Sequence, residues 1–467
     1  ADDFNTCIRK VPEPRVLCYG ANSQFFVKRL LPKDVQDTFS TLFTKTTNLD
    51  DSFSSDASES LCFICQDSDY EIRKTCELLR EKCVSNKIYM IIVPFISTSC
   101  EFIVDEFKDL QINLIELHVE IMKMEKYSFL VPSPDCFARC YVNDDVNDVY
   151  TIARALTKLQ VMNGCPQRVF LAGDMSMKVY EMLEQFKKQV GASYLKADPK
   201  YDEMFIIDRK VDLLTPLASQ FYYGGLIDEK FNGEYGYIKL PKDLPLVIDD
   251  DKQEFETLAS EEFDEVYSEI CSKTVADVAT RLSDYKDEIE SMEDKMQNSI
   301  GTTQWKVHAK RSQRLAEMKP YVLLHFKLLD KIIHFDRLLK PVMNFEYDSL
   351  LMNEPDIDLL IKMMNRQSTL ESLRLLCFMS VTYNGIPSNV LQKFQRRLVD
   401  EYGYKVAKDL LNLEKSGLLI KMSKVFHRNN LPKLTKINSI LNIILNGEKE
   451  ILRSEERRVG KECRSRW

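Results

Sequence analysis

Short apolar runs alternate with amphipathic stretches over residues 15–132. The apolar runs predict strands at Val16–Tyr19, Leu61–Cys65, Ile88–Pro94 and Ile112–Leu117. The stretches between them have the spacing of helices, for example over Asp69–Cys83 and Thr98–Leu110. Strands that alternate with helices are typical of a parallel sheet covered by helices. We therefore predict an α/β domain at residues 1–135.

A second alternation begins near Tyr141. Helices are predicted over Val146–Met162 and Lys178–Val190, with a strand at Arg168–Ala172 and a buried strand at Glu203–Ile207. A two-stranded parallel sheet is too small to be stable alone. We therefore predict an incomplete second α/β domain at residues 136–245 and expect its missing strands to come from beyond residue 452.

The pattern from residue 246 to 452 is helical and predicts a third, all-α domain. One apolar stripe has alternating spacings of four and three residues, which is typical of a long helix packed on a neighbour; it consists of Val278, Leu282, Tyr285, Ile289, Met292 and Met296. A second stripe follows at Leu315, Met318, Val322, Phe326, Leu329 and Ile333. Together the stripes predict a helical hairpin at about 275–338. Shorter helices are predicted at Ile357–Met364, Thr369–Tyr383, Ser388–Tyr402 and Lys405–Ser416, with Gly385 and Gly417 as C-terminal stops.

Composition favours a folded, multidomain protein. Apolar residues make up 44% of the 467 residues, charged residues make up 29%, and only 14 residues are Gly and 16 are Pro. No apolar run reaches the roughly 18 residues that are needed to cross a bilayer. The start of the chain, ADDFNTCIRK, lacks the order of a secretion signal. We expect a soluble, cytoplasmic protein.

The last fifteen residues, 453–467, have the sequence RSEERRVGKECRSRW and interrupt a helical pattern. They can be read as the translation of a sequencing adapter, and we interpret them as an artefact that has no part in the fold. Without them the chain has 58 basic residues (64 − 6) and 69 acidic residues (72 − 3), a net charge of −11. An acidic chain of this kind is a poor candidate for general nucleic-acid binding.

The sequence lacks the common motifs of enzymes. It contains no GxxxxGK[ST] or GxGxxG loop to cradle a phosphate, and no HExxH or GxSxG. Cys62 and Cys65 form a CxxC within a strand-like run, with no second pair. This context favours buried thiols over a zinc or redox site. We therefore expect no metal and no cofactor.

Asp208 is the best candidate for enzymatic chemistry, because it follows a predicted strand and ligands of α/β sheets gather at that edge. A hydrolase-like enzyme that uses Asp208 is the alternative function. The flanking Arg209 and Asp212 favour a structural role, in which local charge pairs and hydrogen bonds hold a loop. Thr215 and Pro216 are predicted to be the N-cap and the first residue of a helix.

The same segment carries a family resemblance. Residues 207–217, IDRKVDLLTPL, are followed by Gln220, Tyr223, Gly225 and the sequence LIDE at 226–229, and they resemble the signature of the Sec/Munc (SM) family. Further matches occur in the expected order at ESLRLLC (371–377), NG (384–385), YGY (402–404) and LNLEKSGLL (411–419). They are similar to the class C vacuolar protein sorting branch of that family. Gly224 departs from the pattern, since the branch usually has an acidic residue there. The short connection after Leu419 favours the A-type paralogue over the B-type.

The resemblance implies an arch-shaped, three-domain SM fold that is α/β plus all-α. It implies a protein that is not an enzyme and that templates SNARE assembly for vesicle fusion, as the SM subunit of a HOPS or CORVET tether on late endosomes, lysosomes or vacuoles. A scaffold that holds two SNARE helices in register lowers the ordering entropy that remains to be lost. A purely architectural scaffold without affinity for SNAREs is a further alternative.

Two surfaces are predicted to bind these partners. On the hairpin, a basic row of Lys306, Lys310 and Arg314 is predicted to meet acidic SNARE surfaces, unless it is only a solvated face. The two apolar stripes are predicted to form the hairpin's own core, and Met292, Met296 and Met318 are the residues in them predicted to make adaptable contacts. Because the family resemblance places the following loop at the face that binds the helical tether subunit, the residues predicted to bind that subunit are Arg428, Leu431 and Leu434.

Overall fold

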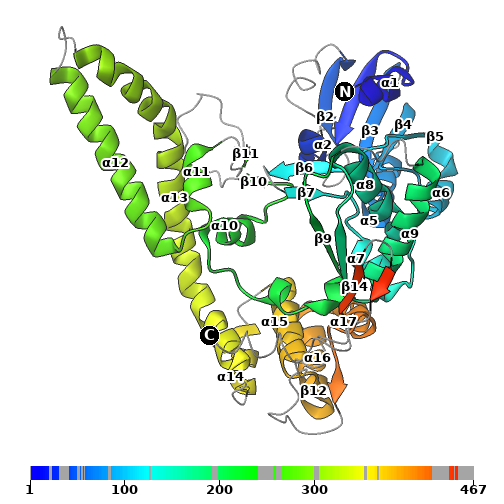
Figure 1. Cartoon of the computed structure of the whole chain (residues 1–467). Coiled ribbons are helices and arrows are strands. Elements are labelled where there is room, and N and C mark those ends of the chain that lie inside the picture. Colours follow the sequence, from blue (N-terminus) through cyan, green and yellow to red (C-terminus); the bar gives the residue numbers. More distant parts are fainter. Residues whose placement is uncertain are drawn as a thin grey trace.

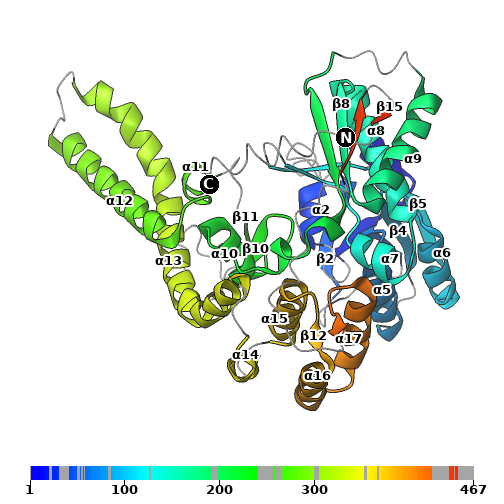
Figure 2. The ribbon, with the colours of Figure 1, turned by 60° about the horizontal axis from the view of Figure 1, so that its bottom comes forward.

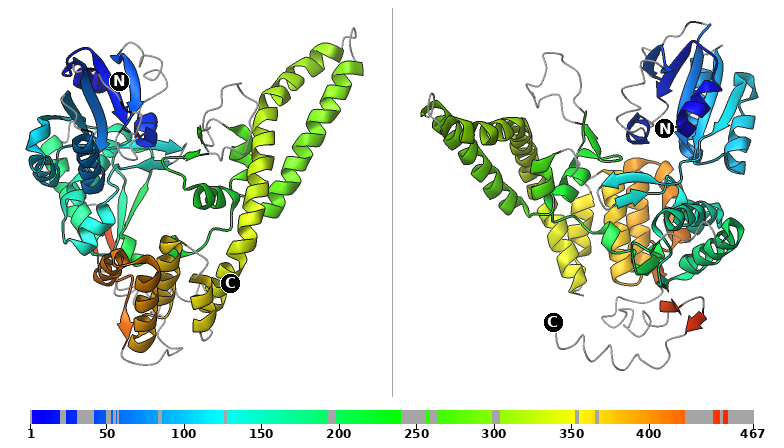
Figure 3. Two further views of the ribbon diagram at one scale, coloured as in Figure 1. Left: turned by 180° about the vertical axis from the view of Figure 1, so that it is seen from behind. Right: turned by 45° about the horizontal axis from the view of Figure 1, so that its top comes forward.

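The computed structural model describes residues 2–19, 24–30, 42–49, 58–82, 86–125, 128–191, 198–239, 256–258, 264–298, 304–351, 355–364, 368–422, 441–445 and 448–450, and the single residues Phe53 and Asp56. Figure 1 shows a sheet with its helices on one side of the molecule and a long helical hairpin on the other. A group of shorter helices lies between them at the base, so that the outline resembles an arch, also when it is seen from behind (Figure 3).

The N-terminal sheet has five parallel strands in the order β2-β1-β3-β4-β5. The strands are β1 (Arg15–Tyr19), β2 (Lys45–Asn48), β3 (Ser60–Gln66), β4 (Lys87–Val93) and β5 (Ile112–Glu116). The four strands that the apolar runs predict are all present. The edge strand β2 has no such run, because it is polar and mostly exposed.

Helices cover both faces of this sheet. One face packs on α1 (Asp2–Arg9) and α2 (Gln24–Leu30), and the other packs on α5 (Asp69–Glu81) and α6 (Thr98–Asp105). Since side chains alternate along a strand, Cys62 lies in the first core and Cys65 in the second. Burial raises the pKa of both thiols. The two cysteines therefore cannot share a zinc ion or form a disulfide with each other.

The second sheet has the order β15-β14-β8-β9. Its parallel pair is β8 (Arg168–Ala172) and β9 (Glu203–Ile207), which are connected through α9 (Asp174–Val190) and preceded by α8 (Asn147–Asn163). The strand β14 (Leu441–Leu445) pairs antiparallel with β8, and β15 (Glu448–Glu450) pairs with β14. The expectation that the missing strands come from beyond residue 452 is therefore wrong for these two strands. They lie within residues 441–450, in a stretch whose pattern predicts helices.

The prediction that β9 is buried is also wrong. As the edge strand it is covered on one face only, where Met204 and Ile206 pack with α9 against β8. On the other face Phe205 and Ile207 are 59% and 63% exposed, and the Phe205 ring stacks on Phe170 with centroids 4.6 Å apart.

The helical hairpin consists of α12 (Val275–Asn298) and α13 (Gln304–Leu350), which run side by side in Figures 1 and 2. The second arm continues past residue 338 to Leu350, although Pro320 and Pro341 lie inside it. Both predicted stripes face the seam: the described members from Val278 to Met292 and from Leu315 to Val322 belong to one buried core.

The remaining elements connect these units. The helices are α7 (Cys136–Val142), α10 (Tyr223–Phe231), α11 (Glu265–Ile270), α14 (Ile357–Met364), α15 (Thr369–Thr382), α16 (Ser388–Tyr402) and α17 (Lys405–Ser416). The short strands pair as β6 (Met122–Glu125) with β7 (Ser128–Leu130), β10 (Tyr237–Lys239) with β11 (Glu256–Leu258), and β12 (Ile386–Pro387) with β13 (Lys421–Met422). Within the described part of the chain, no helix is both long and apolar enough to span a membrane.

Candidate functional site

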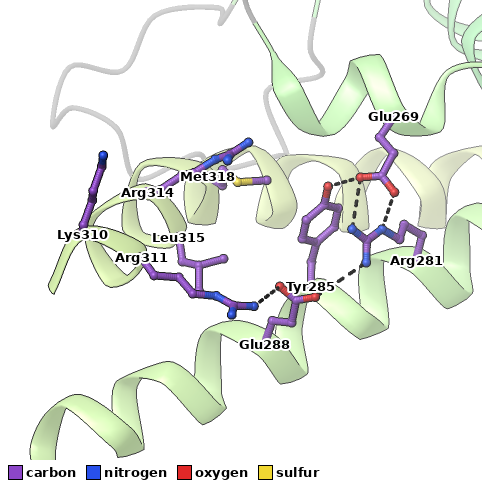
Figure 4. Close-up of a pocket in the computed structure, with 9 residues that line it drawn as sticks. All are labelled: Glu269, Arg281, Tyr285, Glu288, Lys310, Arg311, Arg314, Leu315 and Met318. Atoms are coloured by element: carbon purple, nitrogen blue, oxygen red, sulfur yellow. Dashed lines mark hydrogen bonds and ion pairs between the residues drawn. The ribbon is translucent and has the colours of Figure 1, made fainter. Parts of the chain in front are cut away.

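A pocket of about 600 Å³ lies where the hairpin meets α11 (Figure 4), and we call it the hairpin pocket. Its lining residues are Glu269, Arg281, Tyr285, Glu288, Lys310, Arg311, Arg314, Leu315 and Met318. Four of these side chains are basic and two are acidic, so the lining carries a net charge of +2 (4 − 2). Because the cations come from both arms, only the folded hairpin brings them together.

One acidic side chain of the hairpin pocket is already neutralised from within. Arg281 donates two hydrogen bonds to Glu269, from Nε at 2.6 Å and from Nη2 at 3.1 Å, and the Tyr285 hydroxyl donates a third. The Arg281 guanidinium also lies 4.0 Å from the centroid of the Tyr285 ring. The hydrogen bond from Arg281 lowers the pKa of Glu269. This cluster forms a fixed wall of the pocket (Figure 4).

The cations on α13 form fewer or more exposed ion pairs than Arg281 does. Among the described residues Lys310 has no ion-pair partner, and in Figure 4 its side chain points away from the α11 cluster. Arg311 Nη2 lies 3.7 Å from Glu288 Oε2, and Arg314 Nη2 lies 2.8 Å from Glu265 Oε2. Exposed pairs of this kind contribute little to stability. Carboxylates of a binding partner could therefore take the place of Glu288 and Glu265 with little loss of free energy.

The structure places two of the three predicted basic residues, Lys310 and Arg314, at this pocket, and the side chain of Lys306 lies outside the described part. Sequence reasoning missed Arg281 and Arg311. Arg281 is on the other arm, and Arg311 lies off the four-residue row. No spacing along the chain indicated that these residues meet.

Two of the three methionines predicted as adaptable contact residues lie in the core of the hairpin, which is the interpretation favoured for the two stripes. Met292 and Met318 are only 5% and 8% exposed, because both belong to the seam between the two arms. Met318 still contributes to the lining of the hairpin pocket. Met296, near the end of α12, is half-buried.

A series of buried hydrogen bonds connects the hairpin to α10 and α11. The Tyr223 hydroxyl lies 3.0 Å from His325 Nδ1, and His325 Nε2 lies 2.9 Å from Asp264 Oδ2. Asp264 also caps α11 by accepting a hydrogen bond of 2.9 Å from the Tyr267 backbone N–H. These contacts join α10, α11 and α13, and so fix the hairpin relative to the signature segment.

The Asp208 carboxylate of the signature segment makes three hydrogen bonds within the chain. It accepts them from the backbone N–H groups of Lys210 at 2.9 Å and Met175 at 3.0 Å, and from the Tyr141 hydroxyl. A Cβ on Gly173, whose φ is 91°, would lie 2.4 Å from the Asp208 Cβ. The carboxylate thus connects the start of α9 to the signature loop. Its donors are two backbone N–H groups and one tyrosine hydroxyl.

The predicted helix start at Thr215 takes a different form. Residues Thr215–Leu217 form a single 3₁₀ turn whose N-cap is Leu214, and Thr215 makes no side-chain cap. Asp212 supplies the bonds instead, because its Oδ1 accepts from the backbone N–H groups of Leu214 and Thr215, each at 3.0 Å. Pro216 lies in the first turn as expected, and Arg209 is exposed.

The separate motifs meet in one network. Arg374 donates to Glu229 at 2.6 Å and to the Ser219 hydroxyl at 3.1 Å. Ser219 in turn donates its backbone N–H and its hydroxyl to Glu346, each at 3.0 Å. Burial raises the pKa of Glu346. The network joins α10, α13 and α15, so the motifs mark a joint between helices.

Close packing around Gly224 explains why this position is a glycine in this chain. Its backbone N–H donates to the Cys271 carbonyl at 2.8 Å, and a Cβ on Gly224 would lie 3.1 Å from that oxygen and 3.0 Å from the Tyr267 hydroxyl. An acidic side chain would be crowded in this arrangement. The residues predicted to bind a tether subunit, Arg428, Leu431 and Leu434, lie outside the described part of the chain and remain predictions.

Comparison with known proteins agrees with this architecture. The Sec1 family model matches residues 15–458. Vacuolar protein sorting-associated protein 33A of Rattus norvegicus is 27% identical over 355 residues, which cover 70% of this chain and 56% of that protein. The corresponding protein 33B of Danio rerio is 25% identical over 388 residues, which cover 78% and 59%. The chain thus spans a little over half the length of these curated relatives.

Among solved structures, the Unc18–syntaxin 1 complex from Monosiga brevicollis has a similar fold. The TM-score is 0.55 at 13% sequence identity, and the match covers 92% of this chain and 80% of that chain. Since A-type and B-type proteins both occur among the curated relatives, the preference for the A-type remains a prediction.

Proposed function

Because the chain belongs to the Sec1 family, which is the SM family indicated by its motifs, we propose that it binds SNARE helices at the hairpin and templates their assembly without covalent catalysis. The observation that carries the proposal is the hairpin pocket, which has a net charge of +2 (4 − 2) and a fixed wall. An acidic face of a SNARE helix would complement this charge.

The rigidity of the site suits templating. The seam of the hairpin belongs to one buried apolar core, and hydrogen bonds among Tyr223, His325 and Asp264 hold its base. A helix that docks on a pre-organised surface loses less entropy when the bundle forms than a helix in solution. The similar Unc18 fold was solved together with a syntaxin, which supports a SNARE as the class of partner.

Charge reversal tests this proposal. We expect the double variant Lys310→Glu and Arg311→Glu to weaken the capture of SNARE cytoplasmic domains by at least about tenfold, because a complementary charge becomes a repulsive one. The matched control reverses Lys286 and Lys295, which lie on α12 and do not line the pocket. Equal capture by the wild type and the pocket variant would contradict the proposal.

We further propose that the chain acts in a HOPS-type or CORVET-type tether on late endosomes, lysosomes or vacuoles. The relatives are vacuolar protein sorting proteins, which supports this setting. In this proposal Arg428, Leu431 and Leu434 bind the helical tether subunit.

We expect Leu431→Asp to abolish co-purification of the tether subunit while SNARE capture stays intact. The neighbouring Asn429→Asp introduces the same charge without removing an apolar contact and is the control. Unchanged co-purification with Leu431→Asp would remove this surface from the proposal.

A further inference from the structure

A second pocket, which we call the acidic pocket, has a volume of about 390 Å³ and lies at the end of β3. Its lining residues are Gln66, Ser68, Tyr70, Glu71, Pro134, Asp135, Glu234 and Tyr235. The strand order β2-β1-β3-β4-β5 changes direction between β1 and β3. Ligands of doubly wound sheets bind beyond the carboxyl ends of the strands beside such a reversal. A volume near 400 Å³ is within the usual range of ligand sites, about 300–1,000 Å³.

Glu71 is the central residue of the acidic pocket. It is only 6% exposed, and its Oε1 has no hydrogen-bond partner within the described part of the chain. Burial raises its pKa to about 8. An unpaired acceptor of this kind lowers stability. A buried carboxylate oxygen that lines a pocket without a partner is suited to accept a hydrogen bond from a ligand.

Helix capping does not explain Glu71. Residues 68–71 have the S-x-x-E sequence of a capping box, and Ser368 with Glu371 shows the complete form, in which the Ser368 N–H donates to the Glu371 carboxylate at 2.8 Å. At the start of α5 the Ser68 N–H donates to the Gln66 carbonyl instead, also at 2.8 Å. The carboxylate of Glu71 therefore does not close a capping box: it accepts hydrogen bonds from Gln66 and Cys65, and its Oε1 has no partner among the described residues.

Asp135 supplies a second unpaired carboxylate oxygen. Its Oδ2 is buried without a partner among the described residues, and it makes no side-chain cap on α7. Besides Asp148, the unpaired buried carboxylate oxygens of the described part are those of Glu71 and Asp135, and both line the acidic pocket. The charge of Asp135 helps to raise the pKa of Glu71.

Aromatic rings complete the acidic pocket. Tyr235 has a φ of 54° and is followed by Gly236 at 83°, and Glu234 and Tyr237 exchange backbone hydrogen bonds of 2.9 Å. A tight turn with two positive φ values normally favours Asn-Gly, so tyrosine is strained here by about 1–2 kcal/mol. Its hydroxyl donates to Gln66 Oε1 at 2.6 Å, which holds the ring at the pocket. Tyr70 is 64% exposed at the rim.

We propose that the acidic pocket binds the guanidinium group of an arginine, with Glu71 and Asp135 as acceptors and Tyr70 and Tyr235 as aromatic walls. The lining carries three carboxyl groups and no Lys or Arg. Guanidinium presents five N–H donors in a plane that can serve two separate carboxylates and stack on aromatic rings. Within the described part, no three His, Cys, Asp or Glu side chains gather closely enough to hold a metal ion.

The site is independent of the hairpin pocket, with which it shares no residue. The acidic pocket would allow the α/β domain to contact a basic side chain, whereas the hairpin pocket is proposed to contact acidic side chains. The same chemistry could come from free arginine or from an arginine in a partner protein.

Calorimetric titration of the whole chain tests the proposal. The probes are N-acetyl-arginine amide, the corresponding lysine compound, and the citrulline compound, which has a similar shape without the charge. We expect the arginine probe to bind, the lysine probe to bind at least about fivefold more weakly, and the citrulline probe not to bind. A glycine-serine heptapeptide with one central arginine distinguishes the sources: tighter binding than the amide assigns the site to a protein partner, and equal binding assigns it to free arginine.

Variants make the result specific. In titrations at pH 9, where Glu71 is ionised, Glu71→Gln and Asp135→Asn are each expected to weaken the arginine probe by about tenfold or more, because each removes a charge-assisted bond. Glu234→Gln changes an exposed residue of the lining, so it should leave folding intact and weaken the arginine probe by a smaller factor. Glu101→Gln on α6 is the control, because Glu101 is exposed and lies outside the pocket. Absence of binding to the wild type, or binding that these lining variants leave unchanged, would overturn the proposal.

Discussion

Arg374 Nη1 donates to Glu229 Oε1 at 2.6 Å, although 145 residues separate them in the sequence. Both side chains are largely buried, at 21% and 16% exposure. Arg374 belongs to the motif at 371–377, and Glu229 ends the signature segment, so the two stretches that identify the family are in direct contact. Their role is to join α10 to α15 beside the hairpin.

Arg374→Met should destabilise the protein by roughly 3 kcal/mol, because Glu229 would remain in a largely buried position without its cation. The free energy of unfolding in urea measures the effect. Arg396→Met on α16 is the control, since Arg396 is exposed. A loss no larger than that of the control would mean that the joint contributes little to stability.

Asp208→Asn should lower the free energy of unfolding by about 2 kcal/mol, because an amide cannot accept all the hydrogen bonds that the carboxylate receives from Lys210, Met175 and Tyr141. Tyr141→Phe removes one of these bonds and should cost about half as much. A catalytic role for Asp208 predicts the opposite pattern, in which stability is unchanged and a turnover or a ligand heat disappears.

Glu71 should make stability depend on pH. Its ordinary pKa is 4.5, and burial raises it to about 8 in the folded protein. Between these values the folded protein holds a proton that the unfolded chain has released. The free energy of unfolding therefore falls as the pH rises through this window.

Burial favours the protonated form of Glu71 and outweighs the hydrogen bonds from Gln66 and Cys65, which lower its pKa. Asp135 adds a negative charge, Cys65 and Tyr235 are neutral thiol and phenol groups with raised pKa values, and Glu234 lies at the pocket rim. Glu71→Gln should stabilise the protein by roughly 2–4 kcal/mol at pH 8 and by little near pH 4. Unfolding curves across this range check the effect, and identical pH profiles for both proteins would contradict it.

Gly224→Glu, which restores the residue type usual in the class C branch, should destabilise this chain by about 1–3 kcal/mol through overpacking. The crowding arises at Cβ, which would meet the Cys271 carbonyl and the Tyr267 hydroxyl. Gly224→Ala isolates this effect and should also be destabilising, although alanine is the better helix former. A stabilised Gly224→Ala variant would show that the neighbours move aside.

Local patterns were sufficient to predict many of the elements. Strands β8 and β9 and helices α14, α16 and α17 have the predicted bounds. The reason is that burial on one face imposes a period of 2 on a strand and of 3.6 on a helix. The same reasoning failed for the exposure of β9, because an apolar run does not reveal whether a second layer covers it.

Site residues were harder to predict. Lys310 and Arg314 were found because they share one helix face, whereas Arg281 and Arg311 join them only through the hairpin. Met292 and Met318 have the spacing of a seam, and their burial shows that the seam is internal. The acidic pocket had no counterpart in the sequence, since Glu71, Asp135 and Tyr235 are far apart along the chain.

Motifs and local periodicity were sufficient to predict the family and most of the elements, because both depend on neighbouring residues; β2, β14 and β15 were missed. Which charges meet depends on the tertiary structure. Arg374 and Glu229, the cations of the hairpin pocket and the unpaired carboxylates of the acidic pocket are brought together by packing between distant elements. Contacts of this kind have no period along the chain, and whether a charged side chain is paired, exposed or buried depends on them.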